Sequence, residues 1–198
     1  MSTFTFGNDT LEIEPTQLTI NGQAIQYGAI AAINDHYDDG FLQVAILYFT
    51  NSIFQLIITL NDGSTVPLER KGHSFYGIGT KGTVTRQYRK VTAELQNTLG
   101  PVLVPKLVDQ IRQGTPMHMG NLTITAQGIE AHKEHLLNVE KALPGSQYGS
   151  ANFNINRQVR IFDRDGRQFT GWRTGGGSTS NQNVMFMPQI LDLLYHGR

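Results

Sequence analysis

The feature that most constrains the fold of this chain is a short apolar segment that occurs twice. Residues 18–25 read Leu-Thr-Ile-Asn-Gly-Gln-Ala-Ile, and residues 122–129 read Leu-Thr-Ile-Thr-Ala-Gln-Gly-Ile. A β-prone run that ends in Asp-Gly also occurs twice, at Asp62 and at Asp165. Asp-Gly between β-prone runs is a strong hairpin signal, because both residues tolerate positive φ. The nearly equal spacing of the two pairs predicts two copies of one plan; chance similarity between β-rich segments is the alternative.

A helical pattern follows each of these hairpins. Apolar residues recur at i, i+3, i+4 and i+7, the spacing of one helix face; they are Val104, Leu107, Val108 and Ile111 in the first half and Met187, Ile190, Leu191 and Leu194 in the second. Pro105 and Pro188 suit the first turns of these helices. Gly114 and Pro116 suit a helix end. We predict a first domain over residues 1–114, with a longer helical C-terminal part, and a second over 115–198 with a C-terminal helix at 184–196.

Strand candidates precede each helical pattern. In the first half they cover residues 10–20, 23–33, 41–49, 54–60 and 65–70, separated by turn pairs such as Asn21-Gly22. A sheet with one apolar face must cover that face, and a helix after the last strand can do so. The sequence therefore predicts a mainly β (α+β) chain of two consecutive β-barrel or sandwich units, each closed by a C-terminal helix.

These segments resemble the pleckstrin-homology-like (PH-like) domains of bacterial proteins. The resemblance rests on residues 18–25, on the Ile-Gln-Tyr-Gly-Ala-Ile-Ala-Ala-Ile segment at 25–33, on the hairpin and on the closing helix; it is strongest over residues 113–128. It implies tandem units that bind proteins, peptides or lipid headgroups, without shared catalytic residues. Residues 18–33 lack the Lys and Arg of inositol-lipid-binding members, and Trp172 lies on a predicted strand instead of the closing helix. The inositol-lipid signature is therefore absent.

Composition argues against several classes of function. Lys+Arg and Asp+Glu both number 16, so no overall field attracts nucleic acid or an anionic membrane. The chain has no Cys, which excludes disulfides and thiolate metal sites. No apolar run reaches the roughly 18 residues of a transmembrane helix, and the first residues lack a secretory pattern. We expect a cytoplasmic protein without a transmembrane segment.

An arginine-phenylalanine face is the leading candidate binding surface. If Asp165-Gly166 is a two-residue turn, Phe162 lies opposite Phe169, and one face of the hairpin carries Arg160, Phe162, Arg164, Arg167, Phe169 and Arg173. Arg and aromatic side chains are enriched at protein interfaces. We predict an interface here with a protein partner or within a homo-oligomer. Packing of the two Phe side chains inside the domain is the alternative.

A basic patch is the second candidate surface. No carboxylate occurs between Glu69 and Glu94, and the patch consists of Arg70, Lys71, Lys81, Arg86, Arg89 and Lys90. A helix would place the last three on one face. A solvated surface beside an insertion of about 20 residues is the favoured interpretation of this pattern, and contact with a phosphate, a lipid headgroup or an acidic partner is the alternative.

The remaining motifs predict no catalytic, cofactor or metal site. The Gly-rich residues 171–182 lack the Gly-Lys-Ser/Thr ending of a P-loop, so a flexible loop is favoured over an anion site. His132 and His135, near Glu130 and Glu134, lack a third ligand at metal-site spacing, which favours a surface turn. The sequence thus indicates a non-enzymatic binding or scaffolding module. An enzyme that assembles its site from distant residues such as His73 and His118 is the alternative.

Overall fold

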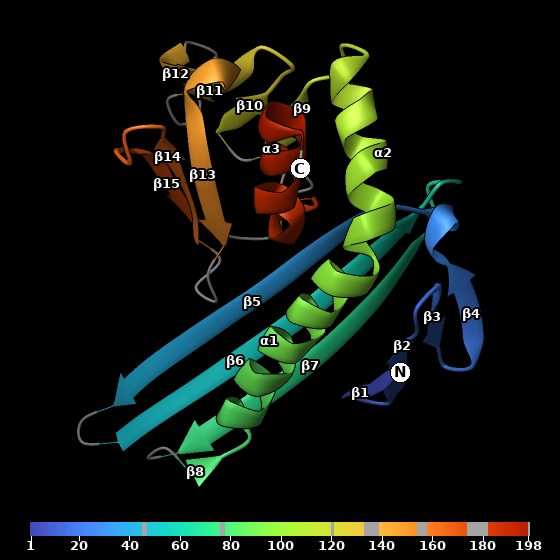
Figure 1. Cartoon of the computed structure of the whole chain (residues 1–198). Coiled ribbons are helices and arrows are strands. Elements are labelled where there is room, and N and C mark those ends of the chain that lie inside the picture. The colour runs from blue at the N-terminus through green and yellow to red at the C-terminus, as the bar shows by residue number, and fades with distance from the viewer. Residues whose placement is uncertain are drawn as a thin grey trace. The chain divides into compact units, whose positions relative to one another are not determined.

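The computed structural model of the chain describes residues 1–44, 47–75, 78–119, 121–132, 139–153, 158–173 and 182–197, without the side chains of residues 39, 41–48, 158 and 170–173. The protein is mainly β, as predicted (Figure 1). Its described strands form four separate antiparallel sheets, none of which closes into a barrel. Contacts divide the chain into two compact units, Met1–Leu99 and Gly100–Arg198.

The first unit contains two sheets and one helix. Its first sheet is a meander of β1 (Ser2–Phe6), β2 (Asp9–Ile13), β3 (Gln17–Ile20) and β4 (Gln23–Gln26). A 3-10 turn, η1 (Tyr27–Ala29), leads into the second sheet. That sheet has the order β5 (Ile30–Val44), β6 (Leu47–Leu60), β7 (Thr65–Phe75) and β8 (Ile78–Gly79). Helix α1 (Lys81–Thr98) follows.

Alternation along β6 separates a core face from an outer face. Phe54, Leu56 and Ile58 are fully buried, whereas the residues between them are only half-buried. Successive side chains of a strand point to opposite faces, so the even-numbered residues of β6 form the core side. Phe6 of the first sheet packs on Phe54, with 5.1 Å between the ring centroids. The core of this unit therefore lies between its two sheets.

Helix α1 covers the core side of the second sheet. It packs on β6 and β7 and buries one stripe of side chains, Val84, Tyr88, Val91 and Leu95. This spacing is that of a single helix face. Residues 81–98, interpreted from the sequence as an insertion ahead of the closing helix, thus form the helix that packs on the sheet.

The second unit begins with helix α2 (Gly100–Arg112). A meander of β9 (Met117–Met119), β10 (Leu122–Ile124), β11 (Gly128–His132) and β12 (Val139–Pro144) follows. After the 3-10 turn η2 (Gly145–Gln147) comes a three-stranded sheet of β13 (Tyr148–Phe153), β14 (Gln158–Asp163) and β15 (Gln168–Arg173). The predicted C-terminal helix corresponds to the 3-10 turn η4 (Val184–Phe186) and α3 (Met187–His196). Helix α3 packs on β13 and on α2.

The division between the units lies after Leu99, whereas the sequence placed it after residue 114. Helix α2 starts at Gly100, so Pro105 lies inside the helix and Pro101 occupies its first turn. The predicted apolar stripe of α2 is buried, and α2 packs against α3. Periodicity identifies the apolar face of a helix, but it does not say which element that face will meet.

Candidate binding surfaces

The outer face of the β5–β8 sheet carries an exposed aromatic pair. Phe49 of β6 lies opposite Phe75 of β7, with 5.0 Å between the ring centroids. The two side chains are 40% and 45% exposed. Phe49 is an odd-numbered residue of β6, so its side chain points away from the face that carries Phe54. An exposed aromatic pair of this kind is apolar surface that a binding partner can cover.

A hollow of about 620 Å³ adjoins this pair. Its described lining residues are Gly40, Phe49, Thr50, Asn51, His73, Ser74, Phe75 and Ile78. The side chain of Ile78 is 82% exposed. Gly40 lies so close to the Asn51 side chain that a Cβ at this position would collide with it. Apolar walls with a few polar groups suit an apolar ligand group that is oriented by hydrogen bonds. The sequence did not predict this site, because Phe49 and Phe75 meet only through the register of two strands.

The structure divides the predicted basic patch. Arg70 is half-buried; its guanidinium donates to Gln87 Oε1 and, at 3.0 Å, to the Thr5 carbonyl. Lys71 points to the opposite face of the strand and forms a 2.7 Å ion pair with Glu69. Bonds from Lys71 and from Gln55 lower the pKa of the Glu69 carboxyl. Arg70 and Lys71 therefore do not share a surface.

The other members of the patch lie on α1. Lys81 is the first residue of the helix and is half-buried. Arg86, Arg89 and Lys90 are all exposed, and their i, i+3 and i+4 spacing places them on one face of the helix. We call these three residues the α1 basic face.

The β14–β15 hairpin has a longer turn than predicted. Asp163 accepts hydrogen bonds from the backbone N–H groups of Asp165 (3.0 Å) and Arg167 (2.8 Å), and Gly166 has φ of 77°. The register shifts between Ile161 and Phe162, so that Phe162 lies opposite Gln168 and not opposite Phe169 as predicted. The Asp163 side chain stabilises the wider turn, and a β-bulge absorbs the extra residue.

The arginine-phenylalanine face is consequently less apolar than expected. Phe162 and Phe169 are half-buried, whereas the arginines whose side chains are described are exposed, namely Arg160, Arg164 and Arg167. Arg167 lies 3.6 Å from the Asp165 carboxylate. The side chain of Arg173 lies outside the described residues. The described part of this face therefore presents exposed arginines beside phenylalanine rings that are only partly accessible.

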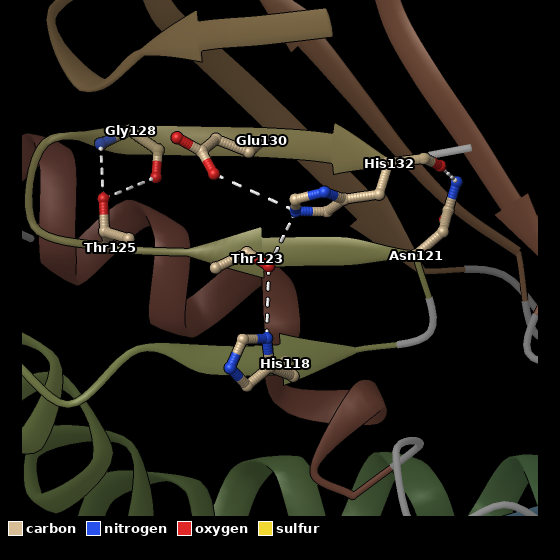
Figure 2. Close-up of polar contacts among 7 residues, drawn as sticks. All are labelled: His118, Asn121, Thr123, Thr125, Gly128, Glu130 and His132. Carbon is tan, nitrogen blue, oxygen red and sulfur yellow. Dashed lines mark hydrogen bonds and ion pairs between the residues drawn. The ribbon is translucent and has the colours of Figure 1, made fainter. Parts of the chain in front are cut away.

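Polar side chains line the outer face of the β9–β11 part of the meander (Figure 2). Thr123 Oγ1 lies 3.1 Å from His118 Nδ1 and 3.0 Å from His132 Nε2. Glu130 Oε2 lies 3.9 Å from the same His132 nitrogen. The structure thus places His118 and His132 on opposite sides of Thr123 (Figure 2), whereas His135 and Glu134 lie outside the described residues. Antiparallel pairing of Thr123 with His118 and with Glu130 creates the cluster.

The geometry of this cluster does not suit nucleophilic catalysis. In a catalytic triad, the acid holds the imidazole nitrogen that is remote from the nucleophile. Here Glu130 and Thr123 approach the same nitrogen of His132 (Figure 2). Among the described residues, no group of three or more His, Asp or Glu side chains could hold a metal ion. The contacts instead connect neighbouring strands, as does the 2.9 Å bond from Asn121 Nδ2 to the His132 carbonyl.

Comparison with known proteins adds no assignment to these surfaces. No protein-family model, curated protein or solved structure matches this chain. Within the part of the chain that the structure describes, no helix has both the length and the apolar character needed to span a membrane. The surfaces themselves therefore carry the functional argument.

Proposed function

We propose that this chain is a non-enzymatic binding protein of two PH-like units, and that its first unit holds an apolar segment of a protein partner in the hollow beside Phe49 and Phe75. The observation that carries the proposal is the exposure of these two rings and of Ile78 around one hollow. Covering exposed apolar area contributes about 25 cal/mol per Å². Buried aromatic side chains are also typical centres of protein interfaces.

The order of elements supports the tandem PH-like part of the proposal. Each unit contains a four-stranded meander, a 3-10 turn, a second antiparallel sheet and a helix packed on that sheet. The Asp62-Gly63 and Asp165-Gly166 turns connect the second and third strands of the second sheet in their respective units. This shared topology supports a common plan for the two halves.

The chemistry of the hollow supports binding over catalysis. His73 is the single ionisable residue among its described lining residues, and no carboxylate accompanies it there. General acid–base catalysis requires a second group positioned to exchange or orient a proton. Aromatic rings, an aliphatic side chain and amide groups suit recognition of an apolar side chain instead.

A phage-displayed random peptide library, selected against the full chain, tests this function. We expect the selected peptides to carry an aromatic or aliphatic anchor. The double variant Phe49→Ser and Phe75→Ser should weaken their binding by about tenfold or more, the scale of an interface hot spot. The matched control is Val139→Ser, since Val139 is an apolar residue of the second unit that is 48% exposed. Equal binding to the double variant and the unchanged chain would contradict the proposal.

Sedimentation velocity of the same variants identifies the kind of partner. A concentration-dependent dimer that disappears in the double Phe variant would identify the partner as a second copy of this chain. A monomer at all concentrations, together with peptide binding that depends on Phe75, would identify a different protein.

A further inference from the structure

Charge is segregated along the first unit. Residues 1–69 contain no Lys or Arg, and residues 70–93 contain no Asp or Glu. Since β7 ends at Phe75 and α1 begins at Lys81, most of these cations lie on the helix. The first turn of α1 has no acidic residue, and the side chain of its N-cap, Thr80, makes no capping hydrogen bond to the helix. Of these cations only Lys81 lies in the first turn, where the helix dipole acts.

The three cations of the α1 basic face make no ion pair or hydrogen bond with another described side chain. Glu94, one turn beyond Lys90, instead accepts a 3.0 Å hydrogen bond from Ser2 Oγ. Arg70 bonds to Gln87, and Lys71 bonds to Glu69. The α1 basic face is thus a compact cluster of three exposed charges within about one helical turn.

The residues around the α1 basic face, and the small extent of this face, indicate which class of anionic partner it can bind. The apolar stripe of α1 is buried in the core, and the other exposed positions of the helix are Gly82, Thr83, Ala93 and Asn97. A helix that binds a bilayer surface inserts large apolar side chains, and α1 exposes none. A nucleic acid is a long polyanion bound through many phosphate contacts, whereas this cluster covers a single turn. Its size fits a short acidic segment.

We propose that the α1 basic face, Arg86, Arg89 and Lys90, docks an acidic segment of a protein partner. Arg guanidinium groups bind carboxylates bidentately, so two or three neighbouring carboxylates can engage the cluster together. Helix α1 lies on the core side of β6 and β7, opposite the outer face that carries Phe49. The acidic segment and the apolar segment of the proposed function therefore occupy different faces of the unit, and this inference does not depend on that function.

Fluorescence anisotropy of a labelled decaglutamate peptide, titrated with the full chain, tests the inference. The triple variant Arg86→Gln, Arg89→Gln and Lys90→Gln should bind the peptide about tenfold more weakly, because it loses three exposed ion pairs with the peptide. Binding by the unchanged chain should also weaken between about 0.02 M and about 0.3 M salt, because salt screens exposed charges. Absence of binding at the lower salt would overturn the proposal.

A second triple variant is the matched control for net charge. Arg160→Gln, Arg164→Gln and Arg167→Gln remove the same charge from exposed positions of the second unit, and peptide affinity should stay within about twofold. Equal losses in the two triple variants would indicate a general charge effect and overturn the proposal. The variant Arg86→Lys with Arg89→Lys keeps the charge but loses the bidentate geometry, so its affinity for the peptide should lie between those of the unchanged chain and the triple Gln variant. Circular dichroism melting confirms that each variant is folded.

Two further probes test the class of partner. Vesicles of phosphatidylcholine with phosphatidylserine, and a short DNA duplex, are titrated under the same low-salt conditions. We expect the vesicles and the DNA duplex to bind the chain more weakly than decaglutamate does. Tighter binding of either probe, lost in the Arg86, Arg89 and Lys90 triple variant, would assign the surface to a membrane or a nucleic acid and overturn the protein assignment.

Discussion

Tyr88 of α1 donates a 2.9 Å hydrogen bond from its Oη to Oδ2 of Asp35 on β5, and both side chains are buried. The ring of Tyr88 also stacks on Tyr37, with 4.8 Å between the centroids. A helix residue and a strand residue 53 positions apart in sequence are therefore connected inside the core. This contact holds the helix that presents the α1 basic face against its sheet.

Removal of that hydrogen bond should destabilise the first unit. Tyr88→Phe leaves the packing volume nearly unchanged but leaves the buried Asp35 carboxyl without this donor. We expect the free energy of unfolding to fall by about 1–3 kcal/mol, measured by urea denaturation. The control is Tyr37→Phe, which removes a hydroxyl that lies 2.6 Å from Thr85 Oγ1. Because Tyr37 is only half-buried, its loss should cost about 1 kcal/mol or less.

Two phenylalanines of β6 should respond differently to truncation. Phe54→Ala removes a fully buried ring from the core and should lower the free energy of unfolding by about 3–5 kcal/mol. Phe49→Ala removes a ring that is 40% exposed and should cost about 1 kcal/mol or less while weakening partner binding. Denaturant unfolding of both variants provides the measurement. A cost for Phe49→Ala as large as that of Phe54→Ala would contradict a binding role for the exposed ring.

The turn of the β14–β15 hairpin should depend on Asp163 more than on Asp165. Asp163→Ala removes the acceptor of two backbone N–H groups, and we expect a loss of about 1–2 kcal/mol in the free energy of unfolding. Asp165→Ala removes an exposed ion pair with Arg167 and should cost at most about 1 kcal/mol. Thermal unfolding distinguishes them. Equal effects of the two substitutions would show that the Asp163 bonds do not stabilise the turn.

The second unit should lose stability at alkaline pH. Burial, and then a 2.7 Å hydrogen bond to Asp192, raises the pKa of Tyr148 above its usual 10.0, and burial raises the pKa of Tyr195. Above about pH 10 these tyrosines ionise in the unfolded chain but remain protonated in the folded one. Below that pH these groups should therefore cause no pH dependence of the free energy of unfolding, and above it they should make this free energy fall as the pH rises. Urea denaturation across this range measures the slope.

The variant Tyr148→Phe supplies the control for that pH dependence. It removes one of the two tyrosines of the second unit whose pKa is raised, so its stability should decline less steeply above about pH 10 than that of the unchanged chain. It should also be less stable at neutral pH, because the bond to Asp192 is lost. Identical alkaline slopes for the two proteins would rule out Tyr148 as the source of the effect.

The two copies of the apolar segment have similar sequences but occupy different positions in their sheets. Residues 18–25 form the β3–β4 hairpin, the third and fourth strands of their meander, whereas residues 122–129 belong to β10 and β11, the second and third of theirs. The helices that the sequence paired are α2 and α3, yet the helix that covers the first unit is α1. Among these repeated sequence features, only the two Asp-Gly turns occupy corresponding places in the two units. Similar hairpins have similar sequences wherever they stand in a sheet.

Surfaces within one element were predictable, and surfaces between elements were not. The spacing of Arg86, Arg89 and Lys90 alone placed them on one helix face, because about 3.6 residues complete a turn. The hollow required Phe49 and Phe75 to meet across two strands, and the His118–Thr123–His132 contacts required three strands in register. The β-bulge in the β14–β15 hairpin, which the sequence did not predict, places Phe162 opposite Gln168 instead of Phe169.

The sequence by itself determined the mainly β class, the Asp-Gly hairpins, the apolar helix faces and the segregation of charge. Each of these depends on the alternation or periodicity of neighbouring residues. Tertiary structure alone decided which helix covers which sheet, where the units divide and which side chains surround the hollow. These features depend on strand register and on packing between distant segments, and a register change of one residue moves every side chain of a strand to the other face.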